Sequence, residues 1–193
     1  KAHPELAKEF TRREKGELPP DWKAALPRWT PGDKALATRQ SSQQVLNKIC
    51  EAIPELMGGS ADLTPSNKTN FKGCVDFQAP TPPGRYMRFG VREHGMASIC
   101  NGMAAHGGLL PYCATFLNFV GYALGAIRVT ALSHFRVLYV MTHDSIGLGE
   151  DGPTHQPVEH LASFRAMPNI YTFRPCDGNE TSGAYAVAVE SRK

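Results

Sequence analysis

The 193-residue sequence lacks the features of several specialised classes of protein. It has no run of about 18 apolar residues, the length that a membrane-spanning helix needs, and its start has no signal-peptide pattern. Its five cysteines are widely spaced and include no CxxC pair, which argues against a disulfide framework and a zinc ribbon. We therefore expect reduced, mostly buried thiols in an intracellular protein without a membrane partner.

The charge pattern also excludes some partners. The formal net charge is +3, and the basic residues are spread along the chain without a cluster, so nothing indicates a nucleic-acid partner. A content of 41% hydrophobic and 20% charged residues is typical of a globular domain. The sequence begins with Lys1 rather than Met, so we expect it to be part of a longer protein, and we expect a cytoplasmic location.

The sequence divides into two parts. Residues 1–34 are polar and rich in proline, with Trp22 and Trp29 as their only large apolar anchors, which predicts an interdomain connector with a short helix near its start. Residues 35–193 have the patterns of one folded domain. We place the domain boundary between these two parts.

Helical and strand patterns alternate through the second part. We predict a helix from Lys34 to Pro54, and then strands near residues 56–63, 86–89, 109–114, 137–141 and 169–173. Helices are predicted after residue 90 and over residues 116–133, 157–167 and 178–190. Strands that alternate with helices of this length favour a mainly parallel sheet covered on both faces, a three-layer α/β/α fold.

The most informative stretch runs from Gly84 to Gly108. A short strand pattern ends at Gly90, and a helix follows whose first turn holds Glu93. Ligands of α/β proteins bind at the carboxyl ends of the strands, where such turns lie. Taken alone, Glu93 is more typical of a solvated first helical turn with a favourable dipole contact.

A second candidate stretch is the loop THDSIGLGEDGPTHQP, residues 142–157. It places His143, Asp151 and His155 after an apolar strand, where they suit hydrogen bonding to sugar hydroxyls or phosphate. Zinc binding by His143, His155 and His160 is the alternative, but their spacing matches no common zinc pattern. We therefore predict no metal ligands in this chain.

Three aromatic residues and two polar ones are ambiguous by themselves. Phe116, Phe119 and Tyr122 recur at helical spacing, which is more often typical of a core. Arg39 and Ser66 are, by themselves, more typical of an exposed arginine on a helix and an exposed serine in a loop.

Four segments taken together closely resemble transketolase. They are GGSADLTPSN (58–67), RFGVREHGM (88–96), TFLNFVGYALGAIR (115–128) and THDSIGLGEDGPTHQP (142–157), in the order and at spacings compatible with the family. The resemblance covers nearly all of the sequence and is confined to the central, pyrimidine-binding domain. It implies the thiamine diphosphate-binding fold, with the last strand of the domain lying beyond residue 193. No GDG, the motif that opens the phosphate-binding run of the family, occurs in the sequence.

The resemblance implies a role for each candidate residue. Transketolases transfer a two-carbon ketol unit between sugar phosphates in the pentose phosphate pathway, with thiamine diphosphate as cofactor. Glu93 matches the catalytic glutamate that acts on the aminopyrimidine ring of the cofactor, and a cofactor site is implied by Phe116, Phe119, Tyr122 and Asp62. The positions that match substrate-binding residues are Arg39, Ser66, His143, Asp151 and His155.

The resemblance also implies partners that these residues do not supply. In the family, Mg or Ca and the diphosphate are held by the phosphate-binding domain of a second subunit in a homodimer. We therefore expect the 193 residues to be inactive by themselves. Two alternatives remain: an enzyme like dihydroxyacetone synthase, which uses formaldehyde as acceptor, and a non-catalytic interaction or dimerisation module of the same fold.

Overall fold

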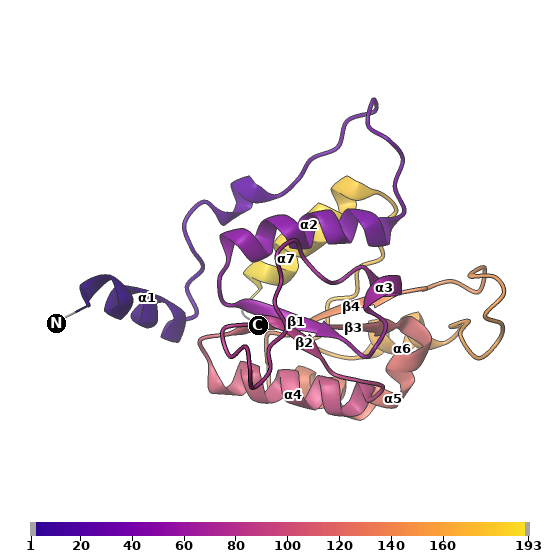
Figure 1. The fold of residues 1–193 in the computed structure, drawn as a ribbon. Helices are drawn as coiled ribbons and strands as arrows, with labels where there is room; N and C mark the ends of the chain where they lie inside the picture. The colour runs from indigo at the N-terminus through magenta and orange to yellow at the C-terminus, as the bar shows by residue number, and fades with distance from the viewer. Residues whose placement is uncertain (1–2, 192–193) are drawn as a thin grey trace.

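The protein, described here by a computed structural model over residues 3–191, is built on one four-stranded sheet. The strands are β1 (Leu56–Ser60), β2 (Tyr86–Arg88), β3 (Leu110–Phe116) and β4 (Leu138–Thr142). They lie in the order β2-β1-β3-β4, and each neighbouring pair is parallel. All four carboxyl ends therefore meet at one edge of the sheet, the right-hand side in Figure 1.

Helices cover both faces of the sheet. Helices α2 (Thr38–Ala52) and α7 (Gly178–Glu190) pack together on the upper face in Figure 1, and α4 (Glu93–His106) and α5 (Val120–Leu132) pack together on the lower face. Two short helices, α3 (Thr64–Asn67) and α6 (His160–Ala166), and the 3-10 turn η2 (Leu117–Phe119) lie near the carboxyl ends of the strands. The predicted three-layer α/β/α fold with a parallel sheet is confirmed.

Apolar cores on both faces of the sheet hold the layers together. Val45, Leu46 and Ile49 of α2 are fully buried against the sheet and α7. On the other face, Ala97 of α4 packs with apolar residues of α5, such as Ile127. Helix α2 follows the amphipathic period that its sequence predicted, because one face is buried and Pro54 prevents further helix.

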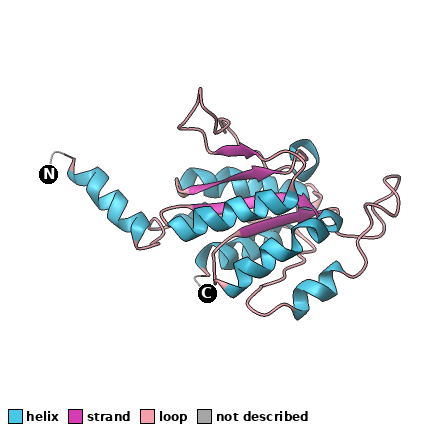
Figure 2. Cartoon of the chain, turned by 90° about the horizontal axis from the view of Figure 1, so that it is seen from below, coloured by secondary structure: helices cyan, strands magenta, loops and turns pink. Residues whose placement is uncertain are grey.

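The segment before α2 runs outside the sheet. Helix α1 (Pro4–Glu14), the helix predicted near the start, projects from the body of the molecule in Figures 1 and 2. Arg12 joins it to the amino end of β1 through two hydrogen bonds to the carboxylate of Glu55, of 2.7 and 2.9 Å. The 3-10 turn η1 (Trp22–Ala25) follows, and Trp22 is buried in the core beside α2.

Trp29 fastens the rest of this segment to α7. The main-chain N–H of Trp29 donates to Asn179 Oδ1 and Asn179 Nδ2 donates to the carbonyl oxygen of Trp29, both at 2.9 Å. The indole ring lies directly over Gly178, where a Cβ atom would come within 2.6 Å of it. The segment is thus held against α7 by both polar and steric contacts.

Two details of the predicted secondary structure are wrong. Residues 169–173 form no strand in the part of the chain that is described, and Tyr171 and Phe173 are 65% and 46% exposed. Residues of high β-propensity form a strand when they can pack on a half-buried sheet surface. In the described part of the chain no strand pairs with residues 169–173, so they stay irregular. The predicted helix over residues 116–133 begins only at Val120, because Phe116 completes β3 and η2 intervenes.

Three of the five cysteines lie in the interior of the protein. All five cysteines are free thiols, and Cys50, Cys100 and Cys113 are buried. Burial raises the pKa of the Cys50 thiol to about 12, so this thiol stays protonated and unreactive at neutral pH. Among residues 3–191, none of the helices is long and apolar enough to cross a membrane.

Candidate functional site

The residues that follow the four strands form a rim at one edge of the sheet. Asp62 and Ser66 follow β1, Glu93 follows β2, Phe116 ends β3 and His143 follows β4. This edge is where α/β proteins bind ligands, because the strand ends and the helix starts leave polar groups there. The parallel register therefore brings together residues that are far apart in the sequence, such as Ser66 and His143, 77 positions apart (66 to 143), which both contact Arg39.

Glu93 is buried at this rim. It is the first residue of α4 and only 6% exposed, whereas its neighbours Arg92 and His94 are exposed. Thr115 Oγ1, on β3, donates a hydrogen bond of 3.1 Å to Glu93 Oε1. A buried carboxyl group held by a neighbouring strand differs from the solvated first turn that the sequence left open.

The aromatic residues line the rim from β3 to α5. The rings of Phe116 and Phe119 are nearly parallel, at 11°, with centroids 5.6 Å apart, and the ring of Tyr122 lies 6.3 Å from that of Phe119. Because Phe116 belongs to β3 and Phe119 to η2, the three do not share one helical face as their spacing predicted. Phe116 is 5% exposed and Tyr122 is 71% exposed, so the row runs from the core to the surface.

His143 connects the aromatic row to Arg39 and Ser66. Its ring stacks on Phe116 with centroids 3.7 Å apart. Arg39 Nη1 lies 3.4 Å from His143 Nε2 and donates a hydrogen bond of 3.2 Å to the carbonyl oxygen of Ser66. Partial burial lowers the pKa of His143, and the nearby guanidinium of Arg39 lowers it further. The ring is therefore mainly neutral at pH 7.

The glycine-rich loop after β4 brings His155 to the same place. The ring of His155 meets that of Phe119 nearly edge-on, with centroids 4.9 Å apart. Asn118 Nδ2 donates to the carbonyl oxygen of Thr154 and so ties this loop to η2. Asp151 is exposed in the loop, and its charge opposes the lowering of the pKa of His143.

Most of the predicted site residues are joined by direct contacts, and Asp62 and Asp151 are not. A continuous path links Arg39, His143, Phe116, Phe119 and His155, as the distances above show. Glu93 joins the rim through Thr115, the residue before Phe116. Asp62 is exposed after β1, in a left-handed conformation (φ 63°), and within residues 3–191 it makes no hydrogen bond, ion pair or ring contact with the others.

The residues between 3 and 191 offer no group of three or more His, Cys, Asp or Glu side chains arranged to hold a metal ion. His160, considered with His143 and His155 as a zinc ligand, lies on α6 next to Gly121. The side chains offered at the rim include the carboxyl groups of Glu93, Asp62 and Asp151, together with two imidazole rings, one guanidinium group and a row of aromatic rings.

Sequence reasoning missed the residues that support the rim. Thr115, Asn67 and Thr142 are buried polar residues that contact predicted site residues or one another, and Asn118 ties down the loop. The sequence did contain one indication for Thr115, because it is a polar residue within an otherwise apolar strand. Asn67 lay within a segment that carried a family motif, but its partner Thr142 is 75 positions away, and sequence patterns do not give such pairs.

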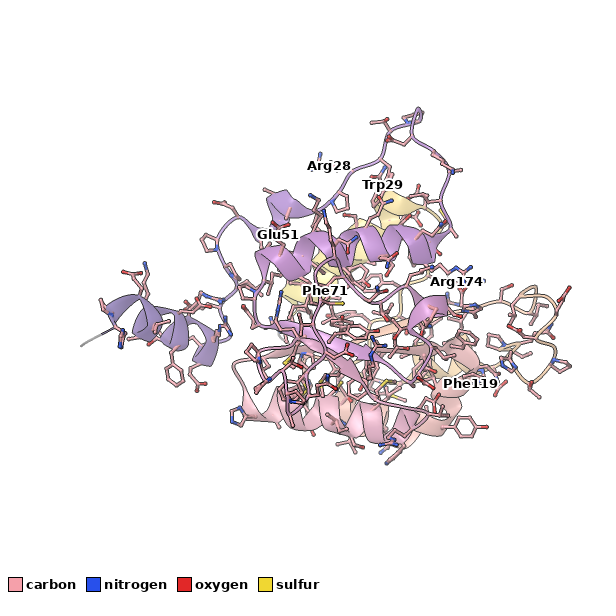
Figure 3. All side chains as sticks on the ribbon, viewed as in Figure 1. Arg28, Trp29, Glu51, Phe71, Phe119 and Arg174 are labelled. Carbon is pink, nitrogen blue, oxygen red and sulfur yellow. The ribbon has the colours of Figure 1, made fainter. Side chains whose placement is uncertain are left out.

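Fold and rim together define a three-layer α/β domain with an aromatic and polar binding edge at the ends of its parallel strands (Figure 3 labels Phe119 and Arg174 near this edge). The family model described as "Transketolase, pyrimidine binding domain" matches residues 34–193. The chain belongs to this family.

Relatives agree with that assignment. The chain is similar to "Transketolase-1, chloroplastic" of Arabidopsis thaliana, at 60% identity over 100% of this chain and 26% of that protein. It is also similar to "Transketolase 2" of Saccharomyces cerevisiae, at 59% identity over 97% of this chain and 28% of that protein. The crystal structure of transketolase from Pichia stipitis in complex with sedoheptulose 7-phosphate matches 98% of this chain and 29% of that one, at a TM-score of 0.95 and 59% identity.

The match is to part of each relative. The chain spans 26 to 37% of the length of the two transketolases of plant chloroplasts that it matches at 60% identity.

Proposed function

We propose that these 193 residues act as the pyrimidine-binding domain of a transketolase, which transfers a two-carbon ketol unit from a ketose phosphate to an aldose phosphate. The observation that carries the proposal is the buried carboxyl group of Glu93, at the end of β2 and beside the aromatic row. A decayed, non-catalytic module has no need of a buried acid at this edge, because burying such a group is costly.

The aromatic row fits the cofactor that the family implies, thiamine diphosphate. The near-parallel rings of Phe116 and Phe119, with the exposed ring of Tyr122 beside them, offer flat faces suited to a planar aminopyrimidine. Glu93 would hold a proton at its carboxyl group and share it with a ring nitrogen. When bound, thiamine diphosphate supplies the nucleophilic carbon and the electron sink for ketol transfer. Asp62 is also assigned to the cofactor, and the basis for this is only its position after β1.

The polar end of the rim is assigned to the sugar phosphate. Arg39 presents a guanidinium fork, the group best suited to phosphate oxygens, and Ser66 and His143 lie in contact with it. His155 and Asp151, on the loop beside the aromatic row, are assigned to the hydroxyls near the reacting carbons. The Pichia stipitis relative was crystallised with sedoheptulose 7-phosphate, which supports a substrate of this class.

The remaining contacts of the cofactor are assigned to another domain. No group in the described residues is arranged to hold a metal ion, and we assign a divalent ion, Mg or Ca, and the diphosphate to the phosphate-binding domain of a second subunit. The active enzyme would then be a homodimer with the site between subunits. For location we keep the expectation of a cytoplasmic enzyme. Because several relatives are named chloroplastic, microscopy of the tagged protein in its own cell would test it.

Replacing Glu93 by Gln tests the proposal. In the complete transketolase that carries this domain, Glu93→Gln keeps the shape of the side chain and removes its acid. We expect ketol transfer to fall by about 10² to 10⁴-fold, the usual contribution of a general acid or base. The affinity for thiamine diphosphate, measured by calorimetry, should fall by much less.

Glu51 provides a matched control. It is an exposed glutamate on α2, labelled in Figure 3 far from the rim, so Glu51→Gln should leave turnover unchanged. Near-normal turnover of the Glu93→Gln protein would remove Glu93 from the mechanism.

The choice of acceptor separates transketolase from its nearest alternative. Phosphate-binding groups at Arg39 and Ser66 favour ribose 5-phosphate over formaldehyde, which offers nothing for them to bind. The intact enzyme should therefore use ribose 5-phosphate with the higher kcat/KM. A preference for formaldehyde would instead favour an enzyme like dihydroxyacetone synthase.

A further inference from the structure

Three buried polar side chains connect β1 to β4 beneath the rim. Ser60 Oγ donates a hydrogen bond of 2.6 Å to Asn67 Oδ1, and Asn67 Nδ2 donates one of 2.6 Å to Thr142 Oγ1. Asn67 is 0% exposed, Ser60 1% and Thr142 9%. Both ends of the Asn67 amide are thus used inside the protein, and a buried network with its members satisfied holds one geometry.

His143 is the last member of this network. Its Nδ1 lies 2.8 Å from Thr142 Oγ1, and its Nε2 lies 3.4 Å from Arg39 Nη1. A guanidinium group can only donate hydrogen bonds, so Nε2 is the acceptor in that pair. In a neutral ring the proton then lies on Nδ1 and is donated to Thr142 Oγ1.

The same bond persists if His143 becomes charged. A phosphate oxygen near Nε2 needs a donor, and a protonated ring carries N–H groups at both nitrogens. Nδ1–H donates to Thr142 in either state, and only Nε2 changes its role. The ring is also confined by its stacking on Phe116 and by a left-handed backbone at His143, with φ of 54°.

We propose that Asn67 is a positioning residue of the candidate site: acting through Thr142, it anchors Nδ1–H of His143 and so presents Nε2 as the ring atom that meets the ligand. The hydrogen bonds from Asn67 through Thr142 to His143 are present whatever the ligand is. The identity of that ligand as a sugar phosphate rests on the proposed function. Asn67 would serve binding of the acceptor rather than the chemical step.

Three variants test this in the complete enzyme. Thr142→Val keeps the shape of the side chain and removes the oxygen that accepts from Nδ1, and Thr142→Ser keeps that oxygen. Asn67→Ala removes the amide, and thermal unfolding monitors whether each variant is folded. Histidine-selective ¹⁵N NMR, with His143→Gln to assign the signal, reports which ring nitrogen carries the proton.

In the wild type and in Thr142→Ser we expect the proton of the neutral ring on Nδ1. In Asn67→Ala and in Thr142→Val we expect a mixture of the two tautomers. The proposal is overturned if the wild-type proton lies on Nε2, or if folded Asn67→Ala and Thr142→Val show the wild-type signal.

Kinetics supply the second measurement. We expect KM for ribose 5-phosphate to rise about tenfold in Asn67→Ala and in Thr142→Val, the size of one lost hydrogen bond, while kcat stays within about twofold. Thr142→Ser should restore the wild-type KM. A fall in kcat at unchanged KM would contradict the positioning role. Absence of ketol transfer in the wild type would instead refute the proposed function, and the NMR result would still decide the role of Asn67.

Discussion

Among residues 3–191, the hydroxyl group of Thr115 is the side-chain donor that forms a hydrogen bond with the buried carboxyl group of Glu93. Thr115→Val keeps the volume of the side chain and removes this donor, and a buried acceptor left without its partner costs about 1–3 kcal/mol. We expect a destabilised protein in which the carboxyl group of Glu93 is less well held, with kcat lowered by roughly tenfold, the equivalent of 1.4 kcal/mol. Steady-state kinetics and urea unfolding of the complete enzyme would measure both effects.

Thr115→Ser is the matched control, because it keeps the hydroxyl group. Wild-type kcat in a folded Thr115→Val protein would show that Thr115 does not position Glu93.

The charge of Arg39 influences the titration of His143. Partial burial lowers the pKa of His143 below its ordinary value of 6.5, and Arg39 lowers it further. Arg39→Ala removes the second cause, so the pKa should rise toward 6.5. A histidine NMR titration would measure the change, with exposed Arg28→Ala as the control that should leave the pKa unaltered.

The sign of the effect on stability follows from linkage. Because protonation of His143 is harder in the folded chain than in the unfolded chain, its stabilising contribution is complete above pH 6.5 and declines as the pH falls through that value toward the lowered pKa. In Arg39→Ala this decline should be smaller. An equal or larger decline would contradict the assignment of Arg39 as a cause.

Among the elements, α2 depends on Arg85 for its carboxyl end. The guanidinium group of Arg85 donates to four carbonyl oxygens between Cys50 and Leu56, at 2.9 to 3.4 Å, and lies 5.1 Å from the ring centroid of Phe71. The last carbonyls of a helix have no partners within the helix, and a cation there also interacts favourably with the helix dipole.

Arg85→Ala should therefore lower the free energy of unfolding by about 2–3 kcal/mol, the combined loss of charge-assisted hydrogen bonds and of the dipole contact. Chemical denaturation would measure the loss. Lys48→Ala, at an exposed position of the same helix, should change the stability by less than about 0.5 kcal/mol. Equal stabilities of the two variants would show that Arg85 does not cap α2.

The order of the elements was predictable from periodicity, and their exact limits were not. Alternating strand and helix patterns identified α2, α4 and the parallel strands, because burial imposes those periods. Residues 169–173 had the composition of a strand but lack a partner strand, and composition carries no information about partners. The burial of Glu93 depends on Thr115, 22 positions away, so the sequence left it undecided between a site and a solvated turn.

At the scale of the whole molecule, the candidate site is open on one side. Tyr122 is 71% exposed, and the described residues supply no group arranged for a metal ion. The purified 193-residue chain should therefore show no measurable ketol transfer and at most weak binding of thiamine diphosphate. Coupled-enzyme assays and calorimetry would test this, after circular dichroism has established that the chain is folded. Robust transfer by this chain alone would contradict the assignment of the other contacts to a second domain.

The contact between Trp29 and α7 constrains how the sequence can evolve. With the indole ring over residue 178, any side chain larger than glycine would collide with it. Substitutions at the two positions should therefore occur together in diverged lineages: glycine at 178 wherever residue 29 is a large aromatic, and other residues there only once the aromatic has been lost. The contact between the segment that contains Trp29 and α7 should therefore be detectable as covariation between positions 29 and 178, which are 149 positions apart.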